Sequence, residues 1–389
     1  NFKEINDNLG HQVGDEFLIH IAKTLGVCIR EHDLLARLGG DEFLIMLRNI
    51  NNYTDVINIA EQIISSMQTP FTINQWDIPT GVSIGIAHAK EAEFDINTLI
   101  SNADIAMYAS KEKGKGSYTV FHRKMLENSK RMAQVANLIS HAIAQNEFEV
   151  VYQLKIAANG EANGLEALIR WHSEELGFIS PGEFIPIAEQ AGKIKAITQW
   201  VVSRVFQDLP TLKQTIGNHV LVSLNLSSHD LKDNHFIDVV KNKLVKYNVD
   251  IANIQFEITE SSYLDNFENS NEFFNQIKQM GGSIALDDFG TGYSSLSVLK
   301  NLSADCVKLD RSFIEDINSS KVDYEITCAV LKLAQILDFS VIAEGLETQN
   351  HVTTLRQIGC KYAQGYFFAR PLPIDDWVSY FLLNSEQNP

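Results

Sequence analysis

The sequence predicts an α/β protein in which a mixed α+β domain precedes a (β/α)8 barrel. The chain has 389 residues, more than one small hydrophobic core normally organises. Over roughly the last 250 residues, a usual length for such a barrel, apolar strand-like runs alternate with helix-length segments. Polar side chains recur near the ends of these runs, where the carboxyl-terminal mouth of a barrel carries its active site.

Composition narrows the class of protein. The content of 45% hydrophobic and 21% charged residues is that of an ordinary globular protein. The net charge of −17 argues against binding to a nucleic-acid polymer. The four cysteines are widely spaced and read as reduced thiols of a cytoplasmic protein. No apolar run approaches the roughly 20 residues that cross a bilayer. The chain starts at Asn1 without a methionine, so we expect a fragment of a longer protein, which could carry upstream sensor or membrane segments.

Apolar periodicity predicts the elements of a first domain over residues 1–121. Helices are predicted at residues 14–30, 54–68 and 96–114, a strand-turn-strand at 33–47, and strands at 81–89 and 117–121. A further helical pattern at 122–145 connects the domains. We assign residues 122–134 to a helical linker and 135–389 to the second domain.

The second domain has a regular rhythm of strand and helix. The predicted strands are residues 148–156, 164–171, 220–227, 254–260, 283–289, 306–313, 340–347 and 362–369. Helical patterns such as 271–282 and 324–338 separate them. Eight such strands favour a closed barrel over an open sheet.

Carboxylate and amide side chains stand near the ends of these strands. They and one lysine are Glu166, Asn225, Glu257, Asp287, Asp288, Lys308, Glu344 and Gln364. Converging carboxylates repel one another unless positive charge lies between them. An oxygen-only donor set suits Mg²⁺ or Mn²⁺, and two such ions about 4 Å apart suit displacement at phosphorus. Lys308 could position the attacking water or neutralise developing charge. The alternatives are a capped turn at Asp287 and Asp288, and an ordinary salt bridge for Lys308.

Seven ordered motifs then resemble one family. "EALIR", "NLS", "FEITES", "LDDFGTGYSSL", "VKLDRSFI", "AEGLET" and "AQGYFFARP", spread over residues 135–385, resemble the EAL-domain cyclic-di-GMP phosphodiesterases. The resemblance implies hydrolysis of cyclic di-GMP to pGpG on a barrel with two Mg²⁺ or Mn²⁺ ions. It also implies a homodimer that forms through the EAL domain.

The resemblance implies roles for individual residues. Those for the first ion are Glu166, Asn225, Glu257 and Asp287, and those for the second are Asp287, Asp288 and Glu344. Lys308 would bind the catalytic water, and Glu344 is a candidate base. The implied substrate contacts are Gln153, Arg170, Asp310, Gln364 and Pro371. Glu347 would anchor the loop at 287–296. Leu154 stands where the family usually has proline in "YQP", so we expect the start of the substrate loop to have a different shape and substrate affinity to differ.

A second resemblance covers residues 1 to about 121. "RLGGDEF", with a turn at Gly39 and Gly40, would alone be an ordinary hairpin, but "NFKEINDNLGHQVGDEFL", "SIGIA" and "ADIAMYASKEKGKG" accompany it. Together these motifs resemble the GGDEF-type diguanylate cyclase domain. The implied GTP and Mg²⁺ contacts are Asn6 and Asp15 at guanine, Asp41 and Glu42 at the metal and ribose, and Lys111 and Lys115 at the phosphates. Arg30 and Asp33 have the R-x-x-D spacing of the family's inhibitory cyclic-di-GMP site, the alternative being a helix-end ion pair worth about 0.5 kcal/mol.

The first domain is N-terminally incomplete by this comparison. The family has a metal-binding aspartate in a "D-x-D-x-F-K" strand, and the chain begins immediately after that point, at Asn1. We therefore expect no cyclase turnover from it, while GTP binding could regulate the barrel. Three hypotheses stand: a phosphodiesterase, a cyclase-dominant or bifunctional enzyme, and a non-catalytic cyclic-di-GMP receptor. The complete set of barrel carboxylates favours the phosphodiesterase.

Overall fold

The structure, a computed structural model, describes residues 2–50, 52–73, 76–114, 116–158, 160–265, 267–290 and 303–385. The chain divides into two compact units, Asn1–Ala133 and Gln134–Pro389. The division falls within one helix, α5 (Arg123–Gln145), which continues along the chain past the end of the predicted linker. The linker at 122–134 as a separate segment stays a prediction. In the part of the chain that the structure describes, no helix is both long and apolar enough to cross a bilayer.

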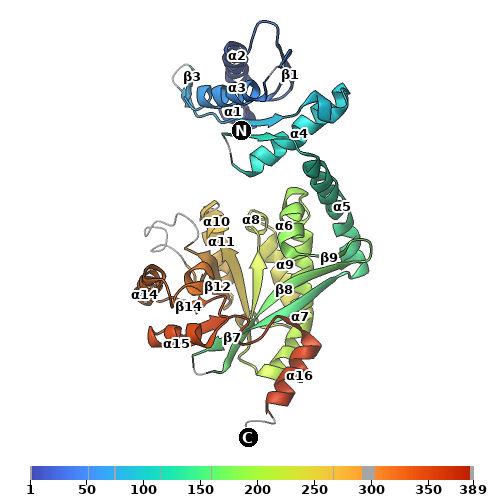
Figure 1. Cartoon of the computed structure of the whole chain (residues 1–389). Coiled ribbons are helices and arrows are strands. Elements are labelled where there is room, and N and C mark those ends of the chain that lie inside the picture. Colours follow the sequence, from blue (N-terminus) through green and yellow to red (C-terminus); the bar gives the residue numbers. More distant parts are fainter. Residues whose placement is uncertain are drawn as a thin grey trace. The chain divides into compact units, whose positions relative to one another are not determined.

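The first unit combines helices with three small sheets (Figure 1). Its helices are α1 (Phe2–Leu9), α2 (His11–Cys28), α3 (Tyr53–Ser66), η1 (Ala89–Ala92) and α4 (Ile96–Glu112). Its strands are β1 (Leu34–Gly39), β2 (Glu42–Met46), β3 (Phe71–Ile73), β4 (Trp76–Ile78), β5 (Ser83–Ile86) and β6 (Ser117–Val120). β1 pairs with β2 and β3 with β4, both antiparallel, while β5 and β6 are parallel. The sequence analysis did not predict α1 or the β3–β4 hairpin.

Local chemistry explains where the helices of this unit begin and pack. α3 and α4 start at residues whose side chains accept a backbone N–H of the first turn, Asn52 and Asp95. α4 lies so close to β5 that a Cβ on Gly85 would stand 1.9 Å from the carbonyl oxygen of Ala103. Glycine is therefore required at the middle of the "SIGIA" motif.

The second unit is a closed barrel of eight strands, which confirms the predicted fold class. In ring order they are β7 (Phe148–Ala157), β8 (Ala162–Ser173), β10 (Leu221–Leu226), β11 (Ile254–Thr259), β12 (Ser283–Phe289), β13 (Cys306–Leu309), β14 (Ser340–Ala343) and β15 (Tyr362–Gln364). Seven of these strands, β8 and β10 to β15, run parallel to one another. The eighth strand, β7, is antiparallel to both of its neighbours, β8 and β15. The barrel therefore differs from a regular (β/α)8 barrel, in which all eight strands are parallel. The link from β7 to β8 is a hairpin, far shorter than the dozen or more residues that a parallel crossover needs.

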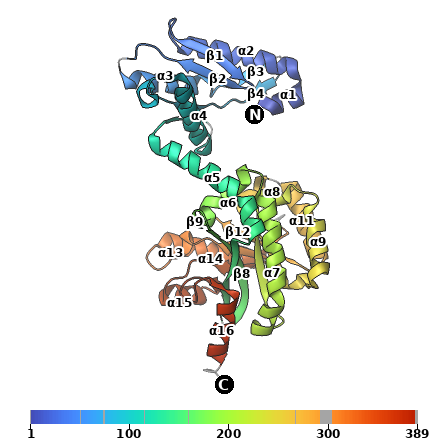
Figure 2. The same ribbon diagram turned by 90° about the vertical axis from the view of Figure 1, so that its right-hand side faces the viewer.

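Helices lie outside the ring of strands (Figures 1 and 2). They are α6 (Pro181–Gln190), α7 (Ile194–Ile216), α8 (Ser228–Leu231), α9 (Phe236–Tyr247), η2 (Ile251–Asn253), α10 (Glu260–Asp265), α11 (Phe267–Gln279), α13 (Ser312–Glu315), α14 (Lys321–Ile336), α15 (Gln349–Gln357) and α16 (Ile374–Ser385). Two short strands extend the sheet, β9 (Gly177–Ile179) beside β8 and β16 (Leu372–Pro373) beside β7. Trp377 of α16 is fully buried and donates a hydrogen bond to the carbonyl of Tyr152, which fixes α16 against β7.

Candidate active site

One lysine stands among four carboxylates inside the barrel. The Nζ atom of Lys308, on β13, lies 2.6 Å from Glu257, 2.8 Å from Glu344, 2.9 Å from Asp287 and 3.3 Å from Glu166. Glu166, Glu257 and Asp287 come from β8, β11 and β12, and Glu344 directly follows β14. Four strands of the barrel and the residue after a fifth thus deliver these side chains to one place.

Amide side chains complete this cluster. Gln364, at the end of β15, donates from Nε2 to Glu166 at 2.7 Å and to Gln153 at 3.0 Å. Asn225, on β10, donates from Nδ2 to the other oxygen of Glu166 at 2.9 Å. The Oε1 atom of Gln364 is buried without a hydrogen-bond partner among the described residues. An unsatisfied buried acceptor marks a place for a further donor or ion.

A second lysine, which the sequence analysis did not single out, reaches the cluster from the other side. Lys155, on β7, is 2% exposed, and its Nζ lies 2.5 Å from Oε1 of Glu257. Lys308 contacts Oε2 of the same carboxylate. The available signal was the spacing from Gln153: residues two apart on a strand face the same way, so both side chains point into the barrel.

Glu257, Asp287 and Glu344 differ in their affinity for protons. Burial acts to raise the pKa of Glu257, but the charges of Lys155 and Lys308 outweigh it and lower this pKa to about 2. Burial raises the pKa of Asp287 to about 6 and that of Glu344 to about 8, with neighbouring carboxylates adding to the effect and Lys308 opposing it. Burial lowers the pKa of Lys308, yet the surrounding carboxylates hold it well above its ordinary value. The positive charges of Lys155 and Lys308 are therefore too few to balance the four carboxylates of the cluster.

This donor set fits a hard divalent cation. One carboxylate oxygen from each of Glu166, Glu257 and Asp287 lies within 4.8 Å of the others. All these donors are oxygens, and Asn225 adds an amide beside them. Oxygen donors with excess negative charge suit Mg²⁺ or Mn²⁺ rather than a thiolate- or imidazole-binding metal.

The two adjacent aspartates take different positions. Asp287 contacts Lys308 with one oxygen and accepts the backbone N–H of Asp288 with the other, at 2.9 Å. Asp288 has a left-handed backbone, with φ 54°, and is more accessible than the buried Asp287. Burial and the charge of Asp310 raise the pKa of Asp288. The chain turns at Asp288, so the capped-turn alternative and a ligand role for Asp287 are compatible.

The loop that follows β12 begins at Gly290, whose backbone has a defined contact. Its continuation, residues 291–302, lies outside the residues that the structure describes. The backbone N–H of Gly290 donates to Glu260 of α10 at 2.9 Å, a contact that the sequence analysis did not anticipate. Glu347, predicted to anchor this loop, pairs with Arg311 at 3.1 Å. Its predicted contact with residues 291–296 therefore stays a prediction.

The remaining predicted substrate residues occupy varied positions. Arg170 is half-buried, with its pKa lowered by burial, and donates to the carbonyl of Ile169. Asp310 accepts the backbone N–H of Ser312. Pro371 directly precedes β16. Leu154 is buried in β7 opposite Leu165, so leucine continues the strand where the family usually has proline.

In the first unit, the described residues predicted to contact GTP are either exposed or lie where two helices pack together. Asn6 of α1 lies against Gly14 of α2, where a Cβ would come 2.0 Å from its Oδ1. Asp15 is exposed on α2, as is Lys111 on α4. Asp41 and Glu42 are exposed at the tip of the β1–β2 hairpin, where Gly40 has φ 50°. Lys115 lies outside the described residues.

Arg30 and Asp33 do not form the ion pair considered as the alternative. The Asp33 carboxylate accepts the backbone N–H groups of Arg30 and Arg48 at 3.0 and 2.9 Å. Although burial acts against it, these bonds lower the pKa of Asp33. The Arg30 guanidinium instead contacts Asp55 at 3.4 Å. An inhibitory site at these residues stays a prediction.

Two family models match the chain, one in each of its two units. The EAL domain model matches residues 136–371, and the model of the diguanylate cyclase GGDEF domain matches residues 1–117. The chain is 34% identical over 385 residues to cyclic di-GMP phosphodiesterase PdeR of Escherichia coli, covering 98% of the chain and 58% of PdeR. It is 33% identical over 381 residues to the bifunctional diguanylate cyclase/cyclic di-GMP phosphodiesterase MucR of Pseudomonas aeruginosa, covering 97% and 55%. The chain thus spans little more than half the length of these relatives.

Solved structures agree with the barrel. The PaMucR phosphodiesterase in complex with c-di-GMP is 33% identical with a TM-score of 0.60, and the match covers 62% of this chain and 99% of that one. The EAL enzyme Bd1971, bound to cAMP and cyclic-di-GMP, is 29% identical with a TM-score of 0.62, covering 65% and 69%. The chain therefore belongs to the EAL domain family, and it carries a GGDEF domain ahead of its EAL domain.

Proposed function

We propose that the chain is a metal-dependent phosphodiesterase that hydrolyses cyclic di-GMP to the linear dinucleotide pGpG. The observation that carries the proposal is the cluster of Glu166, Glu257, Asp287 and Glu344 around Lys308. The names of PdeR and MucR and the ligand of the PaMucR structure support cyclic di-GMP as the substrate. A receptor that only binds this nucleotide would have no use for so costly a concentration of buried carboxylates.

The carboxylates and amides would hold two Mg²⁺ or Mn²⁺ ions. The residues proposed for the first ion are Glu166, Asn225, Glu257 and Asp287, and those for the second are Asp287, Asp288 and Glu344. When bound, such ions neutralise phosphodiester charge and make water a nucleophile at neutral pH.

Among the four carboxylates around Lys308, Glu344 has the most accessible side chain. It is 20% exposed, against 12% for Asp287 and 0% for Glu257. A carboxylate with a raised pKa and access to solvent can accept a proton from water, so we assign Glu344 as the general base. Lys308 holds Glu344 at 2.8 Å and would neutralise charge that develops on the phosphate.

The remaining mouth residues would bind the nucleotide. Arg170 offers a two-pronged donor that matches a phosphate. Gln153 and Gln364 already contact each other, and the unpartnered oxygen of Gln364 is available for a donor on the substrate. We place Asp310 and Pro371 at the edge of the same site.

We further propose a setting for this activity. GTP with Mg²⁺ would bind the GGDEF domain and regulate the barrel, and the name of MucR also supports a bifunctional enzyme in the longer protein. The chain would form a homodimer through the EAL domain, where α14 exposes Val322, Ile326 and Ile336. The four free cysteines suit a cytoplasmic location.

The direct test is to incubate the chain with cyclic di-GMP and Mg²⁺ or Mn²⁺ and separate the nucleotides by chromatography. We expect pGpG to appear, and we expect Ca²⁺ to inhibit because its longer bonds and larger coordination number do not suit a site built for Mg²⁺. Binding of cyclic di-GMP without any product would move the protein to the receptor class.

A further inference from the structure

Glu257 is the most deeply buried of the four carboxylates around Lys308. Each of its two carboxylate oxygens accepts a hydrogen bond from a different lysine. The Glu257 side chain is 0% exposed. Oε2 faces Lys308 at 2.6 Å, on the side of the other three carboxylates. Oε1 faces Lys155 at 2.5 Å. The two oxygens of one carboxylate therefore point into different surroundings.

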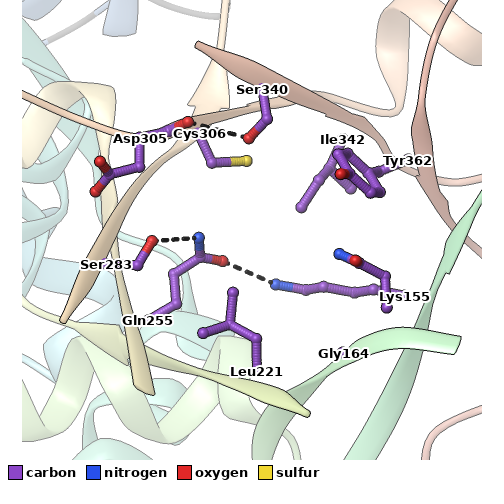
Figure 3. A pocket seen from close by; sticks show the side chains of 11 residues that line it. Lys155, Gly164, Leu221, Gln255, Ser283, Asp305, Cys306, Ser340, Ile342 and Tyr362 are labelled. Carbon is purple, nitrogen blue, oxygen red and sulfur yellow. Dashed lines mark hydrogen bonds between the residues drawn. The ribbon is translucent and has the colours of Figure 1, made fainter. Parts of the chain in front are cut away.

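Lys155 comes from the strand that runs against the others. Because β7 is antiparallel, residues after Gln153 proceed toward the amino-terminal ends of the other seven strands. A cavity of about 210 Å³ lies at that end, lined by residues at the starts of β8 and β10 to β15. Figure 3 shows Lys155 at this cavity, with its ammonium directed toward Gln255. Lys155 therefore approaches Glu257 from the side opposite the mouth.

The position of Lys155 is fixed by its own neighbours. Its Nζ lies 2.5 Å from the hydroxyl of Ser223 and 3.5 Å from Oε1 of Gln255. Ser223 also donates to Gln255. Gln255 donates in turn to Ser283 (Figure 3). The side chains of Lys155, Ser223 and Gln255 are at most 3% exposed. A buried network with satisfied partners holds its members in one arrangement.

We propose that Lys155 is a positioning residue that makes Glu257 a one-oxygen metal ligand and thereby favours Mg²⁺ over Ca²⁺. With Oε1 held by Lys155, only Oε2 faces the carboxylate cluster. Mg²⁺ takes near-octahedral sites with short bonds, whereas Ca²⁺ accepts six to eight oxygens and often both oxygens of one carboxylate. The inference rests on the proposed metal site and adds a source of its selectivity.

The experiment is isothermal titration calorimetry of Mg²⁺ and of Ca²⁺ into the metal-depleted whole chain. The readout is the ratio of the Ca²⁺ dissociation constant to the Mg²⁺ dissociation constant. Lys155→Met removes a positive charge, which strengthens binding of both divalent ions alike, so the ratio isolates the geometric effect. We expect this ratio to fall about tenfold, the low end of effects seen when a partner of a metal ligand is removed.

Two further variants keep the test decisive. Lys155→Arg retains a cation, and the cavity beside it gives room for the larger head, so we expect the ratio to stay near that of the unchanged chain. If circular dichroism shows that Lys155→Met does not fold, Ser223→Ala replaces it. This variant keeps both charges and removes the hydroxyl that holds Nζ, and we expect a smaller fall in the same direction.

The outcomes separate the inference from the proposed function. An unchanged ratio in folded Lys155→Met, or in Ser223→Ala where that variant stands in, overturns the positioning role and leaves the metal site intact. If the unchanged chain binds neither ion, or if Glu166→Ala binds both as well as the unchanged chain does, the proposed metal site itself is wrong.

Discussion

Among the four carboxylates around Lys308, Glu166 has the most side-chain hydrogen-bond partners in the part of the chain that the structure describes. Its two oxygens receive hydrogen bonds from Asn225, Gln364 and Lys308. Glu166 is also one of the three carboxylates whose oxygens lie close enough to share an ion. A residue with this many polar contacts in a cluster of like charges is expected to serve the site more than the fold.

We predict that Glu166→Ala abolishes hydrolysis of cyclic di-GMP while the chain stays folded. The change removes a metal ligand, and it also removes one of several mutually repelling buried carboxylates. Chromatography of pGpG and circular dichroism measure the two effects. The exposed Glu174→Ala is the matched control and should keep full activity. Near-normal turnover of Glu166→Ala in Mg²⁺ would be incompatible with the proposed site.

The raised pKa values of Asp287 and Glu344, about 6 and about 8, predict a pH-dependent response to metal. An acid whose pKa is raised by folding stabilises the metal-free protein below its unfolded pKa, and this contribution disappears as pH rises through 6 and 8. Metal binding must displace these protons. We therefore expect Mg²⁺ to raise the melting temperature more at pH 8.5 than at pH 6.

Thermal unfolding with and without Mg²⁺ at both pH values measures this difference. Below the pKa of Glu344, the Mg²⁺ affinity should fall up to about tenfold per pH unit for each proton displaced. Glu344→Gln cannot release that proton, so its response should depend less on pH. Equal stabilisation by Mg²⁺ at pH 6 and pH 8.5 in the unchanged chain would contradict the assignment.

At the scale of elements, the strand pattern predicted the barrel but not the direction of its first strand. Alternating or continuous apolar residues look the same whichever way a strand runs. The direction of β7 follows from the hairpin that joins it to β8, and the short polar run "AANGEAN" was the signal for it. Lys155 was not singled out, although it lies two residues after Gln153 on the same strand and so faces the barrel interior with it.

The candidate site was predictable in so far as its residues lie on strands of the barrel or directly after them. The structure brings Glu166, Glu257, Asp287, Lys308 and Glu344 together, as strand ends in a barrel should. The contact of Glu260 with Gly290 depends on how α10 meets the end of β12. Such contacts between elements distant in sequence leave no periodic pattern.

The loop after β14 gives a prediction at this scale. Gly345 has φ 72°, and a Cβ there would come 2.5 Å from the Arg311 side chain, which pairs with Glu347. We expect Gly345→Ala to displace Arg311, shift the neighbouring Glu344 and lower turnover at least tenfold, since small misplacements of catalytic groups cost up to about 100-fold.

Gly359→Ala is the matched control for this change. Gly359 also has a positive φ, 86°, but nothing lies within 4 Å of a Cβ built there. Both variants should lose about 1 kcal/mol of stability from backbone strain, and Gly345→Ala alone should lose activity. Equal kinetics in the two variants would show that the packing of Arg311 does not matter for catalysis.

At the scale of the whole molecule, one helix belongs to both units. The division between Asn1–Ala133 and Gln134–Pro389 falls inside α5, so the backbone passes from one unit to the other in helical conformation. Neighbouring backbone hydrogen bonds tie successive turns of a helix together. A change in the first unit that bends or unwinds α5 would therefore alter the backbone conformation at the start of the second unit.

We predict that GTP changes the rate at which the chain hydrolyses cyclic di-GMP, because nucleotide bound to the GGDEF domain would alter the equilibrium of the segment that continues into the barrel. A ligand shifts such an equilibrium only by its differential affinity for the two states, so the effect should saturate with GTP concentration. Initial rates of pGpG formation at increasing GTP measure it. Asp15→Ala, at the predicted guanine contact, should weaken the response, whereas Glu16→Ala, at a neighbouring residue that is also exposed, should preserve it. A rate that does not change with GTP, or that responds equally in both variants, would show that the first unit does not regulate the proposed activity of the barrel.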